Sequence, residues 1–201
     1  DYKMNMTPLL SYESARIYPF DGVKSRVHIK RRYNKSLIEQ DIILKKGAKT
    51  IEFRTCADWH EREKVLKAEF PVDIRARFAA FEVAHGAVER PTYANNSYEK
   101  AMFECCAHKW TDLSESDYGV SLLNDCKYGY DIVGNVMRIT LMRGPVCPDR
   151  KGDIGKNYFT YALYPHSENW ANAGTVKEAF MLNVPLKAVY LPANKSIPSQ
   201  E

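Results

Sequence analysis

The stretch VHIKRRYNKSLIEQDIILKKGAKTIEFRTCA, residues 27–57, alternates apolar and polar side chains with the period of two that β-strands show. The alternation runs through residues 27–33, 37–44 and 51–57, with a Lys46-Gly47 turn before the last run. Period-two runs that are broken by Gly or Asn about every ten residues are typical of hairpins. The stretch therefore predicts antiparallel strands joined by short turns.

Further candidate strands lie at residues 66–70, 74–83, 101–108, 118–124, 136–143, 158–164 and 186–191. Helix-forming sequence is scarce. The best candidate is TVKEAFML, residues 175–182, where Thr175 as N-cap and Glu178 three residues later form a capping-box pattern. We therefore expect an all-β fold: a large antiparallel two-sheet sandwich with at most one short helix near 175–182.

The chain of 201 residues fits one large domain, which we place at residues 23–192. Residues 1–22 are Tyr-rich and show no period, so we expect an irregular lead-in. Residues 193–201 have the composition of an unstructured exit tail. Neither end resembles the natural edge of a compact protein, and we expect a domain truncated at both ends.

Composition argues against a nucleic-acid or membrane function. The net charge is only +4, and acidic residues are mixed among the basic ones. The longest basic run, Lys30-Arg31-Arg32, sits on a predicted strand, where it is typical of a solvated edge. There is no signal peptide and no apolar run near 18 residues. We expect neither nucleic acid nor a membrane as a partner.

The five cysteines predict a reducing compartment. Their odd number, the adjacent Cys105-Cys106 pair and the apolar neighbours favour buried, reduced thiols and a cytoplasmic protein. Cys105, Cys106 and His108 alone do not make a zinc site, because no second CxxC or HxxxH supplies the remaining ligands. We expect no metal site in this chain.

The most charged segment, DWHEREKVLKAEF at residues 58–70, has the composition of an active site without its geometry. An HExxH zinc site needs a second His four residues after His60, and that position is Lys64. No Ser lies in a GxSxG elbow, no Cys has a clear His base nearby, and no phosphate-binding Gly-rich loop is present. The residues therefore define no catalytic set.

Polar and aromatic residues concentrate in four segments, residues 58–67, 89–96, 108–115 and 124–130. Aromatic faces, amides, carboxylates and guanidinium groups are what a sugar-binding site uses. Each segment also has a structural interpretation: Trp59 and Trp110 as core anchors, Asp112 and Ser114 as turn residues, or a local ion pair in the 124–130 loop. Arg90, before Pro91, is the hardest to interpret structurally.

The same segments resemble a known family. DWHEREKVLKAEFPVDIRA, GAVERPTYANNSYEKAMFECCAHKWTDLSESDYGVSLLNDCKYGY, LMRGPVCPDRKGDIGKNYFTYALYPH and MLNVPL are similar to the C-terminal β domain of glycoside hydrolase family 38 α-mannosidases, of the cytosolic or vacuolar type or their bacterial relatives. The resemblance spans residues 23–192. It implies a sandwich like that of galactose mutarotase.

The resemblance implies a function for the parent protein that this chain does not carry alone. Family members are multidomain retaining α-mannosidases whose separate catalytic domain holds zinc or another divalent metal and the nucleophile, followed by a helical bundle. Retention needs two carboxyl groups about 5 Å apart. We therefore expect the parent to hydrolyse terminal α-linked mannose and to form homo-oligomers. We expect this chain alone to be inactive, with no catalytic residue or metal ligand.

The resemblance also nominates substrate-facing residues. A loop Arg of the β domain approaches the sugar pocket in the family, and Arg90 matches it. Asn124, Asp125, Lys127 and Tyr128 form a second group expected to face the catalytic domain. The expected partners are therefore mannosides and the catalytic and helical domains.

Two other functions remain open: a stand-alone carbohydrate-binding sandwich and a mutarotase-like epimerase. The epimerase would need His60, His85 or His108 beside a carboxylate in a cleft, and its only support is analogy of fold.

Overall fold

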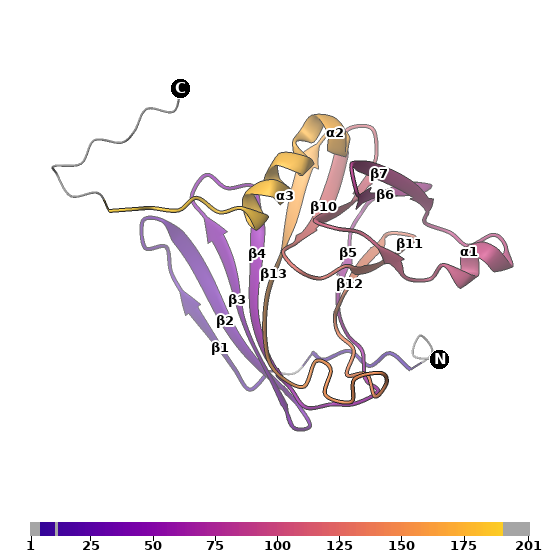
Figure 1. Ribbon diagram of the computed structural model, residues 1–201. Coiled ribbons are helices and arrows are strands. Elements are labelled where there is room, and N and C mark those ends of the chain that lie inside the picture. Colours follow the sequence, from indigo (N-terminus) through magenta and orange to yellow (C-terminus); the bar gives the residue numbers. More distant parts are fainter. Residues whose placement is uncertain (1–4, 11, 191–201) are drawn as a thin grey trace.

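The alternating stretch forms neighbouring strands toward one edge of a long antiparallel sheet in the computed structural model, which describes residues 5–10 and 12–190 (Figure 1). Over these residues the sheet has nine strands in the order β1-β2-β3-β4-β13-β10-β9-β6-β7. Their bounds are β1 Ser14–Tyr18, β2 Lys24–Tyr33, β3 Ser36–Lys45, β4 Ile51–Trp59, β13 Gly155–Ser167, β10 Tyr118–Asn124, β9 Trp110–Ser114, β6 Phe78–Val83 and β7 Gly86–Pro91.

A smaller sheet packs on one face of the large one. In the described part of the chain it has four strands in the order β5 (Leu66–Pro71), β12 (Val136–Met142), β11 (Gly129–Val133) and β8 (Cys105–Cys106). All strand pairs of both sheets are antiparallel. The predicted two-sheet antiparallel sandwich is confirmed.

The main core lies between the two sheets, where period-two alternation brings apolar side chains together. From the large sheet come Ala57, Trp59 and Phe159, and from the small one Ile139 and Met137, each at most 3% exposed. In the charged segment, Trp59 belongs to this core, and Leu66 is partly buried and packs against it. The structural interpretation of Trp59 is therefore correct.

The other face of the large sheet is covered by helices. The described residues form three helices, α1 (Ser97–Ala101), α2 (Trp170–Ala173) and α3 (Thr175–Asn183), where at most one was expected. Ala179 of α3 packs with Trp110, Leu123 and Tyr164 in a second core cluster. The sheet is thus sandwiched between α2–α3 and the small sheet at β9, β10 and β13.

The predicted capping box of α3 is wrong. Its N-cap is Gly174, in the left-handed region at φ +85°, and no side chain caps the helix. Thr175 is the first helical residue, and its hydroxyl oxygen lies 2.7 Å from Ser121 Oγ in the interior. The hydroxyl ties the helix to the sheet, which pattern reasoning along one segment does not detect.

Several predicted element boundaries need correction. Residues 14–18 of the supposedly irregular lead-in form β1, because they pair with β2. The strand predicted at 101–108 is the end of α1 and the two-residue β8, and the one predicted at 74–83 starts at Phe78. Residues 186–190 form no strand. Residues 1–4, 11 and 191–201, which include the expected tail at 193–201, lie outside the described residues.

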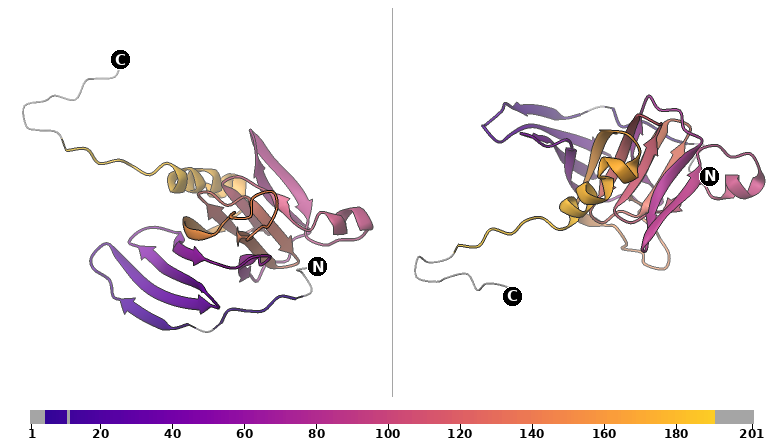
Figure 2. Two further views of the ribbon diagram at one scale, coloured as in Figure 1. Left: turned by 60° about the horizontal axis from the view of Figure 1, so that its bottom comes forward. Right: turned by 90° about the horizontal axis from the view of Figure 1, so that it is seen from above.

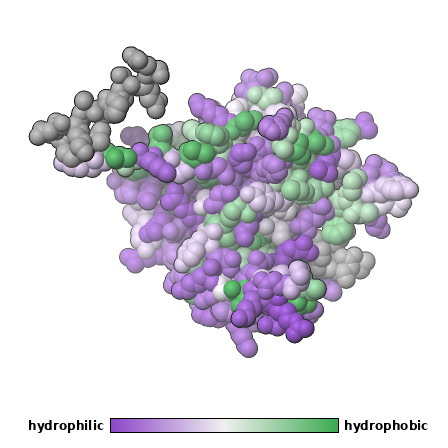
Figure 3. Space-filling model, in the orientation of Figure 1, coloured by the Kyte–Doolittle hydropathy of each residue, from purple (hydrophilic) through white to green (hydrophobic). Residues whose placement is uncertain are grey.

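Apolar side chains are exposed on the outward side of α3. Val176, Phe180 and Val184 are 52, 55 and 56% exposed, and spacing by four places them on one helix face. Figure 3 shows this apolar surface over α3 and the segment that follows it. α3 is therefore apolar on both its packed and its outward side.

Candidate functional site

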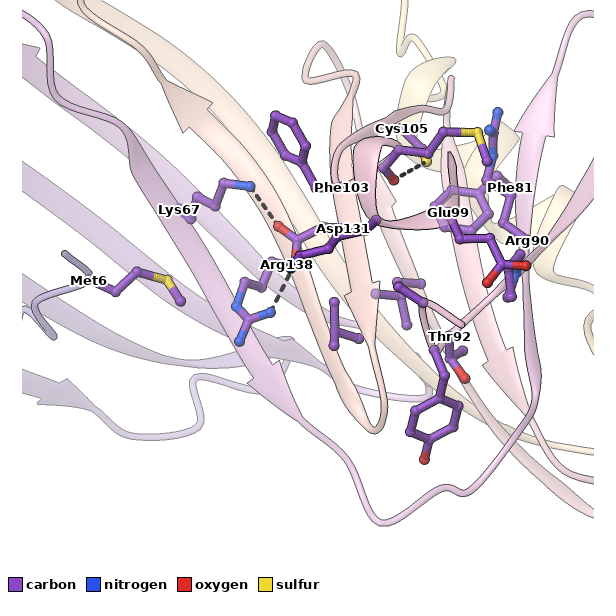
Figure 4. A pocket seen from close by; sticks show the side chains of 17 residues that line it. Met6, Lys67, Phe81, Arg90, Thr92, Glu99, Phe103, Cys105, Asp131 and Arg138 are labelled. Carbon is purple, nitrogen blue, oxygen red and sulfur yellow. Dashed lines mark hydrogen bonds and ion pairs between the residues drawn. The ribbon is translucent and has the colours of Figure 1, made fainter. Parts of the chain in front are cut away.

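A cavity of about 380 Å³ opens beside Arg90 (Figure 4). Its walls come from the end of β7 and the segment at 91–94, and from α1 and the segment that leads to β8. Residues of β5, β11 and β12 on the outer face of the small sheet form its floor. Most of the lining is apolar, and a few charged side chains converge on it, as in small-molecule sites.

Arg90 reaches this cavity because of its position in the β6–β7 hairpin. It pairs with Ala79, and the guanidinium carbon lies 5.4 Å from the centre of the Phe81 ring, the diagonal neighbour on the same face. Phe81 is 3% exposed and fixed in the core. An aromatic face beneath the guanidinium holds the cation in place without using its N–H donors.

Within the described part of the chain, Arg90 forms no ion pair, and its buried Nε has no hydrogen-bond partner. The Cys105 thiol lines the same cavity. Burial raises the pKa of that thiol, and the charge and hydrogen bond of Arg90 oppose the rise without cancelling it. Arg90 thus retains donors for a ligand or a neighbouring domain.

The cavity floor carries a network of paired charges. Asp131 accepts from Lys67 Nζ at 2.6 Å and from Arg138 Nη1 at 2.9 Å, and Arg138 Nε donates to Glu69 at 2.6 Å. Burial opposes the charge of Arg138, but hydrogen bonds to Asp131 and Glu69 outweigh it and raise the pKa of the guanidinium. The cations of the floor are neutralised within the fold, in contrast to Arg90.

Asn124 and Asp125 have structural partners. Asn124 is fully buried, and its amide donates to the His108 carbonyl at 2.6 Å while its side-chain oxygen accepts from the Lys127 N–H at 2.6 Å. Asp125 Oδ2 accepts from the Thr160 N–H at 2.9 Å. The two residues hold the 124–128 turn against the sheet.

Lys127 and Tyr128 lie at the surface of that turn. The Lys127 ammonium is 4.7 Å from the centre of the Phe159 ring, and Tyr128 is 53% exposed with its ring edge-on to His108. None of the four residues at 124, 125, 127 and 128 lines the Arg90 cavity. The structure therefore does not bring the two nominated groups together in one cavity.

The charged segment after β4 forms a corner. Glu61 accepts from Asn34 Nδ2, the Lys35 N–H and Ser36 Oγ at 3.3, 3.1 and 2.9 Å. Burial works against its charge, but these hydrogen bonds outweigh burial and lower the pKa of Glu61. His60 pairs with Asp58 at 2.8 Å. The polar side chains of the corner thus bond to neighbouring residues of the chain and stabilise the fold there.

A buried Asp112–His166–Ser121 cluster was not predicted. His166 Nε2 lies 2.8 Å from Asp112 Oδ2 and 3.1 Å from Ser121 Oγ. One ring nitrogen contacts both groups, so the imidazole does not stand between acid and nucleophile as in a catalytic triad. The Asp112 and His166 side chains are 1 and 2% exposed, which excludes substrate. Three separate strands, β9, β10 and β13, supply the cluster, so no local sequence signal could have indicated it.

The described residues contain no group of three His, Cys, Asp or Glu side chains placed to hold a metal ion. All five cysteines are free, but Cys106, Cys126 and Cys147 are exposed and Cys56 and Cys105 half-buried, so the prediction of buried thiols is wrong. Cys56 lies in β4 and Cys105 and Cys106 in β8, whereas Cys126 and Cys147 lie in loops. Among the described residues no helix has the length and apolar character that crossing a membrane requires.

Comparison with known proteins matches residues 2–151 to the family model "Glycosyl hydrolases family 38 C-terminal domain". The chain is 44% identical over 157 residues to "Alpha-mannosidase 2C1" of Mus musculus, covering 78% of this chain. It is 47% identical over 129 residues, 64% of the chain, to "Alpha-mannosidase" of Saccharomyces cerevisiae.

The chain spans 15% of the length of the mouse protein and 12% of the yeast protein. A crystal structure of an α-mannosidase from Enterococcus faecalis matches the fold with a TM-score of 0.73 at 15% identity, over 83% of this chain and 24% of that one. The match to the family model covers most of the chain, and the chain belongs to the glycosyl hydrolase family 38 C-terminal domain family.

Proposed function

We propose that this chain is the β domain of a larger retaining α-mannosidase that hydrolyses terminal α-linked mannose. The observation that supports the proposal is its 42–47% identity to α-mannosidases of mouse, Dictyostelium and yeast, over a domain without a catalytic set of its own. Retaining hydrolysis places two carboxyl groups about 5 Å apart across the sugar. We assign those groups to another part of the polypeptide.

Within that enzyme, Arg90 is proposed to complete the rim of the sugar pocket. The guanidinium is stacked on Phe81 beside an open cavity, and it forms no ion pair within the described part of the chain. A guanidinium held in this way binds a sugar hydroxyl or a developing negative charge in a fixed orientation. Little side-chain entropy is lost on binding, because the side chain is already held in place. Lys127 and Tyr128 are proposed to face the catalytic domain, while Asn124 and Asp125 shape their turn.

Zinc, or another divalent metal, is proposed to belong to the catalytic part of the polypeptide. The described residues of this chain offer no set of ligands for it, so no step of the reaction is assigned to metal here. We also propose a cytoplasmic enzyme, consistent with five cysteines that form no disulfide. The catalytic and helical domains and mannosides would be its partners, and the enzyme is proposed to form homo-oligomers.

The alternatives have less support. For the epimerase, none of His60, His85 and His108 lines the Arg90 cavity. His28 and Asp41 do lie 2.8 Å apart in a shallow depression on the large sheet, but Asp41 is also paired with Arg26. The hypothesis of a stand-alone sugar-binding module predicts that the chain by itself binds mannose.

The test compares the full-length polypeptide with the 201-residue chain in hydrolysis of an aryl α-mannoside. We expect turnover by the full-length protein with retained anomeric configuration, read by NMR of the first product formed. The separate chain, checked for folding by circular dichroism, should give none. Full-length protein without turnover contradicts the proposal, and tight mannose binding by the chain alone in calorimetry favours the binding module.

A further inference from the structure

Helix α3 carries apolar side chains on two opposite sides. Its inner side packs on β9 and β10, with Ala179 buried and Leu182 partly buried in the second core cluster. Its outer side is apolar as well, and the side chains there, each 46–56% exposed, are Val176, Phe180, Met181 and Val184. A helix that is apolar all round is typical of a buried position. The outer side of α3 therefore has the composition of a surface that another part of a protein covers.

Hydrogen bonds at both ends hold α3 in this orientation. At its first residue, the Thr175 hydroxyl oxygen lies 2.7 Å from the Ser121 hydroxyl oxygen, and both residues are fully buried. At its last residue, the Asn183 amide donates to the Asn124 carbonyl at 2.9 Å. Rotation of the helix to bury Phe180 would break these bonds and leave buried polar groups without partners. The outer side is thus a fixed surface of the fold.

The apolar outer side of α3 lies at the periphery and continues beyond the helix. In the left view of Figure 2 the gold helix lies at the outer edge of the molecule. The segment that follows it also exposes apolar side chains, at Leu186, Val189 and Tyr190. Helical spacing places one charged residue, the exposed Lys177, on the same side. A continuous apolar patch on a fixed surface marks a contact with a partner.

We propose that the outer side of α3 docks on another domain of the larger polypeptide, through an apolar surface of that domain. This inference rests on the proposed function in one respect, that the chain is part of a longer enzyme. Docking removes the apolar area of Phe180 and its neighbours from water, which stabilises the contact. An acidic residue on the partner surface would match Lys177 and fix the orientation of the two domains.

The same polypeptide is the favoured source of the partner surface. The chain spans 15% of mouse α-mannosidase 2C1 and 24% of the Enterococcus structure, so relatives carry most of their length outside this region. The described lead-in packs elsewhere, because Leu9 contacts the main core on the other face of the large sheet. A second copy fits less well, since a stable dimer buries about 800 Å² on each partner, more than four half-exposed side chains provide. A tethered domain needs less area, because its effective concentration is high.

The test measures thiol reactivity in the native full-length protein. Val176→Cys and Met181→Cys probe the outer side of α3 and leave the Phe180 ring in place. Lys151→Cys is the control, at an exposed loop position before the start of β13, whereas α2 and α3 follow the end of that strand. Each variant is labelled with a maleimide, and the modified peptide is quantified by mass spectrometry, which separates it from the native cysteines. We expect both probes to react at least about tenfold more slowly than the control, because labelling then requires local opening.

A labelling rate equal to that of the control at either probe position would overturn the inference. A benzophenone side chain at position 180 then identifies the partner by photo-cross-linking in a mixture of isotopically heavy and light full-length protein. Cross-links within one polypeptide to residues outside this chain support the inference, and heavy–light cross-links would overturn it in favour of a second copy. Hydrolysis of an aryl α-mannoside is measured on the same samples: active protein with unprotected probes refutes only the docking surface, and inactive protein with protected probes refutes only the enzyme proposal.

Discussion

The corner at residues 58–63 and the cavity around Arg90 are both rich in charged residues, yet their side chains are used in opposite ways. In the corner, Glu61 accepts three hydrogen bonds, and the Glu63 N–H donates to the Gly144 carbonyl at 2.8 Å. At the cavity, Arg90 rests on an aromatic ring, and its buried Nε is without a partner in the described residues.

A high density of charged residues along a sequence is therefore a poor indicator of a binding site. Hydrogen bonds within the fold use up the corner's acceptors, which leaves little for a ligand. One cation with free donors beside an open cavity is a stronger indication, since binding groups must remain unsatisfied until the ligand arrives. Four substitutions test this contrast.

The largest effect is expected in the corner, from Gly144→Ala. Gly144 has φ +53°, and an added Cβ would lie 2.2 Å from the Glu61 carbonyl oxygen and 3.2 Å from Trp59 Nε1. Backbone strain and a clash with fixed atoms should cost roughly 3 kcal/mol or more of unfolding free energy. Urea denaturation measures it.

Gly86→Ala is the control for this substitution, because an added Cβ there meets nothing within 4 Å. It should leave the unfolding midpoint nearly unchanged. If Gly144→Ala proved equally mild, the corner would be adaptable, and its interpretation as a closed structural element would fail.

The next effect is expected at the cavity and on activity. In the full-length enzyme, Arg90→Ala should lower kcat/KM by about 1.5–3 kcal/mol, the contribution of a charge-assisted hydrogen bond. Unfolding free energy should fall less, because the contact with Phe81 contributes only about 0.5–1 kcal/mol. Steady-state kinetics and denaturation on the same preparation separate the two quantities.

Arg150→Ala, at an exposed loop position outside the cavity lining, is the matched control and should be neutral in both measurements. An unchanged kcat/KM for Arg90→Ala would remove the residue from the sugar pocket. A loss of stability as large as the loss of activity would make Arg90 structural, like the corner.

The sequence predicts much of this fold because alternation reports directly which face of a strand is buried. The runs at 27–33, 37–44 and 51–57 become β2, β3 and β4 with boundaries that shift by three residues or fewer. Prediction failed where tertiary contacts decide. β1 forms only because it pairs with β2. The Thr175 hydroxyl contacts the Ser121 hydroxyl instead of capping its helix.

Of the candidate site, sequence reasoning reached Arg90 but not its surroundings. Arg90 was singled out by its place before Pro91, whereas Phe81, Cys105 and Asp131 approach from elements 9 to 41 positions away in sequence. Asn124 was nominated through the family resemblance, in a group expected to face the catalytic domain. The fold instead buries it fully to hold a turn, and burial of a single polar residue leaves no period to detect.

A third substitution tests the paired charges on the floor of the cavity, for comparison with Arg90 in its wall. Asp131→Asn removes the charge that joins Lys67 to Arg138, three side chains that are 11–16% exposed. We expect a loss of about 1–3 kcal/mol in unfolding free energy, less than for a fully buried pair, because water still reaches the site. Thermal and urea unfolding of the full-length protein measure it.

Glu39→Gln is the control here, because Glu39 pairs with Lys30 where the two side chains are 33 and 41% exposed. Exposed pairs contribute about 0–1 kcal/mol. Equal losses of unfolding free energy from the two substitutions would show that the cavity floor is no more rigid than the surface. The contrast between the paired charges of the floor and Arg90 would then no longer hold.

The smallest effect is a pH dependence in the corner. Hydrogen bonds from Asn34, Ser36 and Lys35 outweigh burial and lower the folded-state pKa of Glu61 below its ordinary value of 4.5. A carboxyl with a depressed folded pKa binds more protons when unfolded. Its contribution to the free energy of unfolding is therefore present above the unfolded pKa and disappears as pH falls through the folded pKa.

Glu61→Gln should therefore lower the free energy of unfolding by about 0.5–1 kcal/mol at pH 7, and the difference from wild type should vanish in strong acid. Glu63→Gln, which changes a neighbouring exposed carboxyl, is the matched control, and urea midpoints are measured from pH 7 downward for all three proteins. If the stability difference between Glu61→Gln and wild type persisted in strong acid, the shape of the Glu61 side chain, and not its charge, would stabilise the corner. The corner and the Arg90 cavity would then differ only in how their side chains pack.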